Sequence, residues 1–275
     1  MSVVIPNWNG RALLEVNVPA VLAELERARA AGRAAELIVV DDGSTDDSAA
    51  WLRRAHPQVR VIERARNGGF AAACNLGVRA AAGEIVYLLN SDAEFLPGAL
   101  STVPAAFEAP DVFAMASLEE RGWWPIGDLR GRGQAPPLRA RYIRAPLPGR
   151  TPVLFASGGH AAFRRSMFLE LGGFDERYAP FYWEDIDLCW RARRRGWRIL
   201  LDPRSRVRHA GGGSLLRAAG RVRRWAIRRR NAARFSRRLF ATAEDRETAR
   251  AWLSRLSAAA PAGVLRPVAW TLALG

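Results

Sequence analysis

Polar side chains follow two apolar runs of the sequence, where a sheet protein would place ligand chemistry. Asn90, Ser91 and Asp92 follow "IVYLL", and Asp41 and Asp42 close "ELIVVDD". Open α/β sheets bind ligands at the carboxyl ends of their strands. Asn90 and Asp92 differ by one residue from the Asp-x-Asp pair that holds a divalent metal on a nucleotide diphosphate, although a polar turn is the alternative. Asp41 and Asp42 could bind a nucleobase or ribose, or supply only turn and cap chemistry.

Two further groups could act on a bound substrate. Glu184, Asp185 and Asp187 crowd the start of a predicted helix, directly after the aromatic residues 181–183. Aromatic neighbours can desolvate a carboxylate and raise its pKa, which suits a general base. An ordinary amphipathic helix with its core side inward is the alternative. His209 precedes a glycine turn and could bind a metal, or be a structural histidine.

The segment "RNGGFAAACNLG" (66–77) could contact phosphate. Gly68 and Gly69 would let backbone amides approach a ligand at a helix start. The segment matches neither the Rossmann nor the P-loop pattern, so a plain helix entry is equally consistent with it.

The elements that must position these residues alternate between strand and helix. We expect strands at 2–6, 36–42, 59–64 and 84–90, with helices at 11–31, 44–55 and 68–83 between them. Such alternation predicts an α/β fold with a doubly wound, mostly parallel sheet. Further along we expect a helix over 97–108, strands at 112–118, 197–201 and 205–209, and helices at 166–171 and 184–195, with ordered structure resuming at 153–165. We expect a domain over 1–213 and a basic helical C-terminal extension over 214–275, with long loops over 119–151.

Composition bounds the partners of the chain. It has 275 residues, 49% of them hydrophobic, and a formal net charge of +15, and all 42 basic residues are arginine. This charge favours anionic partners such as phosphorylated substrates, acidic lipid or nucleic acid.

Two distant cysteines predict neither a disulfide framework nor a zinc site. No apolar run reaches the roughly 20 residues of a membrane span, and no signal peptide is recognisable, so we expect a cytoplasmic protein, soluble or peripheral at the inner face of the membrane.

Taken together and in order, the motifs resemble the family 2 glycosyltransferases of the GT-A fold, most closely the bacterial rhamnosyltransferase-like branch, whose members serve cell-wall or polysaccharide biosynthesis. The resemblance covers roughly residues 2–240. It is carried by "VVIPNWNG" (3–10), "VVDDGSTD" (39–46), "NGGFAAACNLG" (67–77), "LLNSDAEF" (88–95), "ASGGHAAFRR" (156–165), "GGFDERYAPFYWEDIDLCWRARRRGW" (172–197) and "HAGGGS" (209–214).

The resemblance implies a role for each matching position. Asp92 and His209 would hold Mg²⁺ or Mn²⁺, and Asp185, with Glu184 beside it, would be the general base. Glycines 158 and 159 would lie on the acceptor side. The remaining positions would bind the nucleotide sugar: Pro6, Asn7, Asp41, Asp42, Asn67, Gly68, Asn90 and Ser91.

The implied reaction is an inverting sugar transfer. The sugar, a deoxysugar such as rhamnose, would pass from a nucleoside diphosphate to a hydroxyl of a glycan or lipid-linked acceptor. The metal would stabilise the leaving diphosphate, while Asn90 would offer a neutral oxygen to it. The alternatives are a non-catalytic nucleotide-sugar-binding protein and a nucleic-acid-binding protein. No nucleic-acid-binding signature is present, so we expect no nucleic acid. A nucleotidyltransferase is also conceivable on a related sheet, but this sequence has no glycine-rich, lysine-containing amino-terminal signature of one.

The basic segment has two interpretations. Ten arginines lie between residues 217 and 238, and Leu215, Val222, Trp225 and Ala226 share one helical face. A basic amphipathic helix can lie on an acidic membrane surface. Alternatively, it is a solvated helix packed on the catalytic domain.

Overall fold

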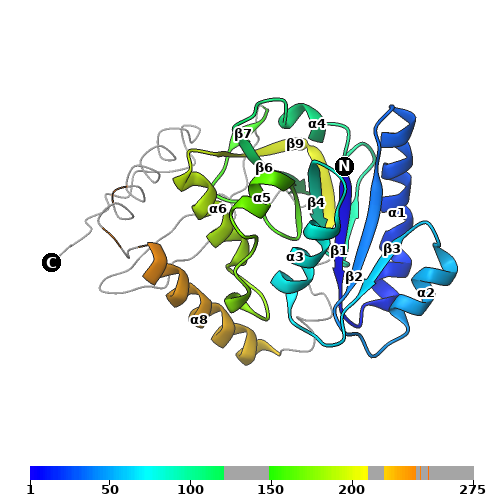
Figure 1. The fold of residues 1–275 in the computed structure, drawn as a ribbon, viewed down its shortest axis with the longest axis horizontal. Coiled ribbons are helices and arrows are strands. Elements are labelled where there is room, and N and C mark those ends of the chain that lie inside the picture. Colours follow the sequence, from blue (N-terminus) through cyan, green and yellow to red (C-terminus); the bar gives the residue numbers. More distant parts are fainter. Residues whose placement is uncertain (121–148, 210–219, 240–241, 243–246, 248–275) are drawn as a thin grey trace.

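A computed structural model describes residues 1–120, 149–209 and 220–239, together with residues 242 and 247. Its centre is a nine-stranded sheet in the order β3-β2-β1-β4-β8-β6-β9-β5, with β7 paired to β9 (Figure 1). The strands are β1 (Ser2–Asn7), β2 (Glu36–Asp41), β3 (Arg60–Glu63), β4 (Ile85–Leu89), β5 (Ala93–Phe95), β6 (Val112–Glu119), β7 (Thr151–Pro152), β8 (His160–Arg164) and β9 (Arg198–His209). The helices are α1 (Arg11–Ala30), α2 (Ser48–Ala55), α3 (Phe70–Ala80), α4 (Val103–Ala106), α5 (Arg165–Glu170), α6 (Glu184–Arg194) and α8 (Arg221–Leu239), with a 3₁₀ turn at Glu176–Tyr178.

The sheet consists of a parallel half and a mixed half. Strands β3, β2, β1 and β4 run parallel and are linked by α1, α2 and α3. Strand β8 is antiparallel to both β4 and β6, whereas β6 is parallel to β9. The first half is therefore the doubly wound unit expected from the sequence, and the second half adds a mixed set of strands to its edge.

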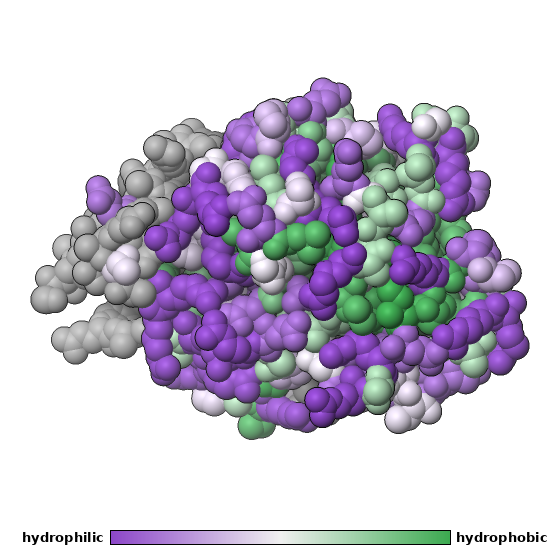
Figure 2. Space-filling model, in the orientation of Figure 1, coloured by the Kyte–Doolittle hydropathy of each residue, from purple (hydrophilic) through white to green (hydrophobic). Residues whose placement is uncertain are grey.

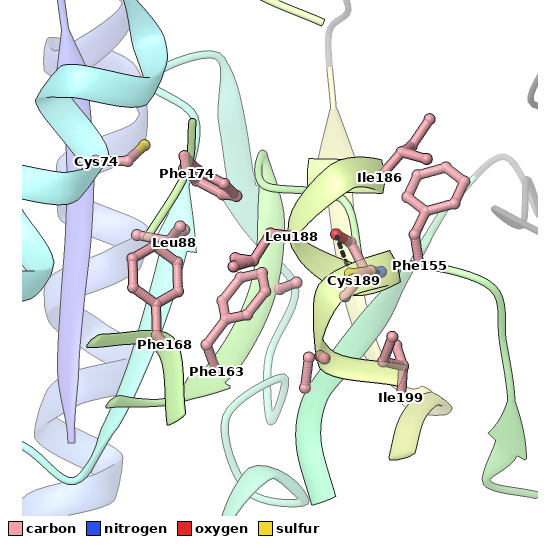
Figure 3. Packing of buried hydrophobic residues seen from close by; sticks show 14 of the residues in the cluster. Cys74, Leu88, Phe155, Phe163, Phe168, Phe174, Ile186, Leu188, Cys189 and Ile199 are labelled. Atoms are coloured by element: carbon pink, nitrogen blue, oxygen red, sulfur yellow. Dashed lines mark hydrogen bonds between the residues drawn. The ribbon is translucent and has the colours of Figure 1, made fainter. Parts of the chain in front are cut away.

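Alternate strand residues supply two cores, one on each face of the sheet. Val4 and Leu88 pack with α3 and α6, whereas Val3 and Leu89 pack with α1 and α4. This alternation follows from the two-residue side-chain period of a strand. Figure 3 shows the first core, where Leu188 of α6 lies close to Phe163 of β8. The two-sided burial fixes the strand register and hence the positions of the strand ends.

The structure refines three predicted segments. The helix expected over 97–108 is only the single turn α4, which begins at Val103, after a turn in which Gly98 has a φ of +83°. Within 153–165, the strand β8 begins only at His160, after the glycines at 158 and 159. The two strands expected at 197–201 and 205–209 are one strand, β9, because a bulge opposite Ser117 accommodates Pro203.

Helix α8 packs against the mixed half of the molecule, beside α6 (Figure 1). Its Phe235 is fully buried in the first core, and the ring lies 5.5 Å from that of Trp183. Hydrophilic side chains cover the visible surface over α6 and α8 (Figure 2). The predicted boundary at 213/214 and nearly all of the expected loops over 119–151 lie outside the described residues, as does the extension beyond α8 except residues 242 and 247. Among the helices described, none is long and apolar enough to cross a membrane.

Candidate active site

One pocket at the carboxyl ends of β1, β2 and β4 gathers most of the predicted site residues. Its wall includes nine of the twelve: Pro6, Asn7, Asp42, Asn90, Ser91, Asp92, Glu184, Asp185 and His209. These residues come from segments up to about 200 residues apart in the sequence. The parallel strands supply the first six, the start of α6 supplies the two acids, and the last residue of β9 supplies the histidine.

The three remaining predicted residues do not line the pocket. Asp41 accepts hydrogen bonds from the Asn7 side-chain amide at 3.0 Å and from the Ser44 amide at 2.9 Å, so it holds the turn after β2. Asn67 is exposed and accepts a hydrogen bond from the Gly69 amide at 3.1 Å. The Gly68 amide donates to Asp42 at 3.0 Å. All three stabilise the turns that carry the pocket-lining residues, through hydrogen bonds within those turns.

Asp42 joins the turn after β2 to the entrance of α3. Its carboxylate accepts from the amides of Gly68 and Gly69, the latter at 2.8 Å, and is paired with Arg64. Three donors thus occupy a group that has about four lone-pair sites. Asp42 therefore fixes the glycine turn and keeps room for about one further donor from a ligand.

Two asparagines shape the centre of the pocket. The backbone N–H of Asn90 donates to the carbonyl of Gly159 at 2.8 Å, and this hydrogen bond joins the loop after β4 to the start of β8. A β-carbon on Gly159 would lie 2.6 Å from the Asn90 side-chain nitrogen, so this glycine permits the close approach. The Asn7 Oδ1 is buried without a hydrogen-bond partner in the described chain, and this side chain lines the pocket. A buried acceptor of this kind favours a ligand that brings a donor.

One corner of the pocket has the chemistry of a divalent cation site. The His209 Nε2 lies 3.1 Å from the Asp92 Oδ1, and the Asn90 side-chain nitrogen lies 3.5 Å from the same ring nitrogen. Neighbouring ligands of an octahedral Mg²⁺, each about 2.1 Å from the metal, are about 3.0 Å apart. The Asp92 Oδ1 and the His209 Nε2 are therefore as far apart as two neighbouring ligands of a divalent cation. The Asn17 side-chain amide steadies the loop by donating to the carbonyl of Ser91 at 2.8 Å.

The protein's own groups partly neutralise the charge at this corner. Burial would lower the pKa of His209, but its hydrogen bonds to Asp92 and Glu119 outweigh burial and raise the pKa to about 9. Burial likewise opposes ionisation of Glu119, but hydrogen bonds from His160 and His209 hold its pKa at about 2. The histidine is therefore an imidazolium between two carboxylates, and a cation at Asp92 would replace its Nε2 proton.

Sequence analysis missed Glu119 and His160. Glu119, His160 and His209 bring their ligating atoms within 4.8 Å of one another. Neither Glu119 nor His160 lines the pocket. His160 lies within the recognised segment 156–165, and Glu119 directly follows the predicted strand 112–118, but nothing in their local sequence distinguishes them from structural residues. Sequence analysis also gave no role to Trp8, Phe70 and Ser157, which line the pocket.

The two acids at the start of α6 have different environments. The Asp185 carboxylate accepts hydrogen bonds from the amides of Gly158 at 3.2 Å and Ile186 at 2.8 Å. Glu184 is 5% exposed, and its Oε2 has no hydrogen-bond partner in the described chain. Burial, and then the charge of Asp185, raise the pKa of Glu184 to about 8; burial also raises the pKa of Asp185. Burial therefore disfavours ionisation of both carboxyl groups, and the charge of Asp185 disfavours ionisation of Glu184 further.

The loop before α6 is held in an unusual conformation by α8. Tyr182 and Trp183 have φ values of +77° and +81°, a region that residues with large side chains seldom adopt. The Asn231 side-chain amide donates to the carbonyls of Tyr178 at 2.6 Å, Phe181 at 3.1 Å and Tyr182 at 3.0 Å. Because Phe181 and Tyr182 line the pocket, α8 positions one wall of the site.

Solved structures share this fold. GalNAc-T7 with UDP, GalNAc and Mn²⁺ superposes with a TM-score of 0.63 and 19% identity, over 76% of this chain and 43% of that one. The mannosyltransferase PcManGT from Pyrobaculum calidifontis, in complex with GDP-Man and Mn²⁺, has a TM-score of 0.59 and 22% identity, over 94% of this chain and 75% of that one. The parallel half joined to a mixed half is thus the GT-A fold of glycosyltransferases, as the sequence predicts.

The family follows from the sequence comparisons. The family model "Glycosyl transferase family 2" matches residues 2–172. The N-acetylglucosaminyl-diphospho-decaprenol L-rhamnosyltransferase of Mycobacterium tuberculosis is 30% identical over 209 residues, which cover 64% of this chain and 67% of the relative. The chain therefore belongs to family 2 of the glycosyltransferases, in its rhamnosyltransferase-like branch.

A second relative is longer than the chain. The pre-mycofactocin glycosyltransferase of M. tuberculosis is 32% identical over 186 residues, which cover 64% of this chain and 38% of that protein.

The acids of α6, His209 and Asn231 all lie beyond residue 172, so the part of the pocket that they build lies outside the match to the family model.

Proposed function

We propose that the protein is an inverting, metal-dependent glycosyltransferase that moves a deoxysugar such as rhamnose from a nucleoside diphosphate to an acceptor hydroxyl. The observation that carries the proposal is a single pocket containing both the Asp92–His209 corner and the Glu184–Asp185 pair. An acid–histidine pair suits a cation on the diphosphate, and a buried carboxylate suits deprotonation of a hydroxyl. The relative that acts on a decaprenol diphosphate supports a lipid-linked or glycan acceptor.

In this proposal, residues of the parallel half bind the donor. Asp42 and the buried Asn7 Oδ1 offer acceptors to the donor nucleoside. Asp92 and His209 would hold Mg²⁺ or Mn²⁺, with the Asn90 side chain beside them. The cation would stabilise the developing charge on the diphosphate as it leaves. The remaining requirement on the protein is to hold both substrates in line and to exclude water.

Asp185 is the general base in this proposal. Two backbone amides orient its carboxylate, and burial makes the carboxylate a stronger base than an exposed aspartate. It removes the proton of the acceptor hydroxyl, whose oxygen attacks the anomeric carbon from the face opposite the diphosphate. The bond to the diphosphate breaks as the new glycosidic bond forms, so the configuration inverts. A protonated Glu184 beside it would limit the negative charge of this pair of acids to one carboxylate.

The proposal is tested by the product. Purified protein would first be screened by thermal shift against nucleotide sugars with and without Mn²⁺. The stabilising donor would then be incubated with a short N-acetylglucosaminyl-diphospho-polyprenol, and NMR would give the anomeric configuration of the product. Retention would refute the inverting mechanism. Binding without transfer to any acceptor would favour a non-catalytic nucleotide-sugar-binding protein. Thermal stabilisation by nucleic acid alone would favour a nucleic-acid-binding protein.

The exposed side of α8 supports contact with an acidic membrane, where a lipid-linked acceptor would reside. Val222 is 81% exposed and Trp225 is 59% exposed. Arginines 223 and 229 are exposed beside them. Interfacial tryptophan and arginine together suit an anionic lipid surface. Arg228 and Arg230 also contact the protein, at the Tyr182 hydroxyl and the Ala179 carbonyl.

The membrane part of the proposal needs residues that do not brace the site. The triple variant R223Q/W225A/R229Q should lose sedimentation with phosphatidylglycerol vesicles and keep its thermal stability. The variant R53Q/R54Q, on the exposed surface of α2, is the control for loss of charge. Equal sedimentation of the triple variant and the wild-type protein would refute a membrane role for this surface.

A further inference from the structure

A carboxylate behind the pocket wall is shared by two histidines. The Glu119 Oε1 lies 3.1 Å from the His160 Nε2 and 3.3 Å from the His209 Nδ1. The three residues stand at the end of β6, the start of β8 and the end of β9. Since β6 pairs with both β8 and β9, the sheet itself brings these strand ends together.

The contact determines which nitrogen of His209 faces the pocket. Glu119 accepts from the Nδ1 side of the ring, while the Nε2 points at Asp92, 3.1 Å away. A histidine that binds a metal through one nitrogen generally donates its other N–H to a carboxylate or carbonyl, and this contact fixes the tautomer and the ring orientation. Glu119 occupies the place of that acceptor for His209.

His160 has no evident role other than holding Glu119. It is 2% exposed, and its Nδ1 has no hydrogen-bond partner among the described residues. Burying an unpaired polar nitrogen costs stability, so an apolar residue would serve better if packing were the only requirement. The hydrogen bond to Glu119 is therefore the feature of His160 that calls for an explanation, and it restricts the carboxylate to the orientation that meets His209.

We propose that Glu119 and His160 are positioning residues of the cation site: Glu119 orients His209 toward Asp92, and His160 orients Glu119. This inference rests on the proposed function, because it takes Asp92 and His209 as the cation ligands. Neither residue lines the pocket, so their effect on a substrate is indirect.

The test measures binding of Mn²⁺ alone to the full-length protein, by the electron paramagnetic resonance of free Mn²⁺. Glu119→Ala and His160→Phe should each weaken Mn²⁺ binding about 10- to 100-fold, the usual effect of removing such a partner. Glu119→Gln keeps an oxygen that accepts from Nδ1, so its affinity should lie closer to wild type than to Glu119→Ala. Glu120→Gln is the matched control, because Glu120 is exposed and pairs with Arg208.

A second measurement reads the tautomer directly. The chain has only three histidines, so long-range ¹⁵N–¹H spectra of the Mg²⁺-loaded protein can resolve His209. It should carry its proton on Nδ1 in the wild type and lose this preference in Glu119→Ala. If Glu119→Ala does not fold, His160→Phe decides the matter through the same two measurements.

The outcomes separate the two proposals. If the wild-type protein binds no Mn²⁺, the metal-dependent function fails, and this inference fails with it. If the wild type binds Mn²⁺ but Glu119→Ala and His160→Phe bind it equally well with an unchanged His209 tautomer, only the positioning role is overturned. Weaker binding in both variants, with normal binding in Glu120→Gln, supports it.

Discussion

Replacing Glu184 by glutamine should stabilise the protein, and the gain should grow as the pH rises. Glu184 is buried beside Asp185, and its pKa of about 8 compares with 4.5 for an ordinary glutamate. Below pH 4.5 the group is protonated in both the folded and the unfolded chain, so its titration does not change the free energy of unfolding. Above that pH the unfolded chain ionises while the folded chain keeps its proton, so the free energy of unfolding falls until the pH passes 8.

The magnitude follows from the difference between these pKa values. At 1.36 kcal/mol per pKa unit, the wild-type protein loses about 3 kcal/mol by pH 7 and about 5 kcal/mol above pH 8. Glutamine is close in shape to a protonated glutamate and does not ionise, so Glu184→Gln escapes this loss. Any packing effect of the substitution is independent of pH and leaves the trend intact.

Urea unfolding at pH 5, 7 and 9 would measure the effect. The difference in free energy of unfolding between Glu184→Gln and wild type should increase by several kcal/mol across this range. Glu26→Gln serves as the control, because the Glu26 side chain is 69% exposed and should show a small, nearly constant difference. A difference for Glu184→Gln that is the same at pH 5 and pH 9 would show that Glu184 ionises normally, and the division of roles between Glu184 and Asp185 would be wrong.

Three other substitutions probe the site. Asp92→Ala should abolish transfer at any Mn²⁺ concentration while the protein stays folded, and near-normal turnover in a radiochemical assay would contradict its role. Gly159→Ala would place a β-carbon 2.6 Å from the Asn90 side chain, so the KM for the donor should rise about tenfold in steady-state kinetics; an unchanged KM would argue against Asn90 in the donor site. Asn231→Ala leaves three buried carbonyls without their donor and should cost about 2–4 kcal/mol in urea unfolding, with a larger loss in kcat than in donor KM.

The parallel half of the fold was predictable because its signals are local. Strands β1, β2 and β4 are short apolar runs, and the structure places them within one residue of the predicted bounds. Their ends fix the positions of Asn7, Asp42 and Asn90.

The mixed half was harder to predict because its features depend on distant partners. Strand β9 continues past Pro203 because its residues 203–205 bulge out of the pairing with β6, which resumes at Arg206. Glu119 meets His209 across 90 residues of sequence, and no spacing rule connects the two. The packing of α8 depends on Asn231, an ordinary residue in a run of arginines, whose role becomes visible only beside the loop that it holds.

The position of Asn231 late in the chain has a consequence for biosynthesis. The parallel strands β1, β2 and β4 leave the ribosome before α8, and they pack against α1 and α3, which are made with them. The loop with Tyr182 and Trp183 in the left-handed region, however, gains its hydrogen-bond donor only after about 50 further residues have been made. A nascent chain that has not yet reached α8 therefore lacks the hydrogen-bond donor that holds the loop before Glu184 and Asp185. Under the proposed function, transfer cannot begin before α8 has been made.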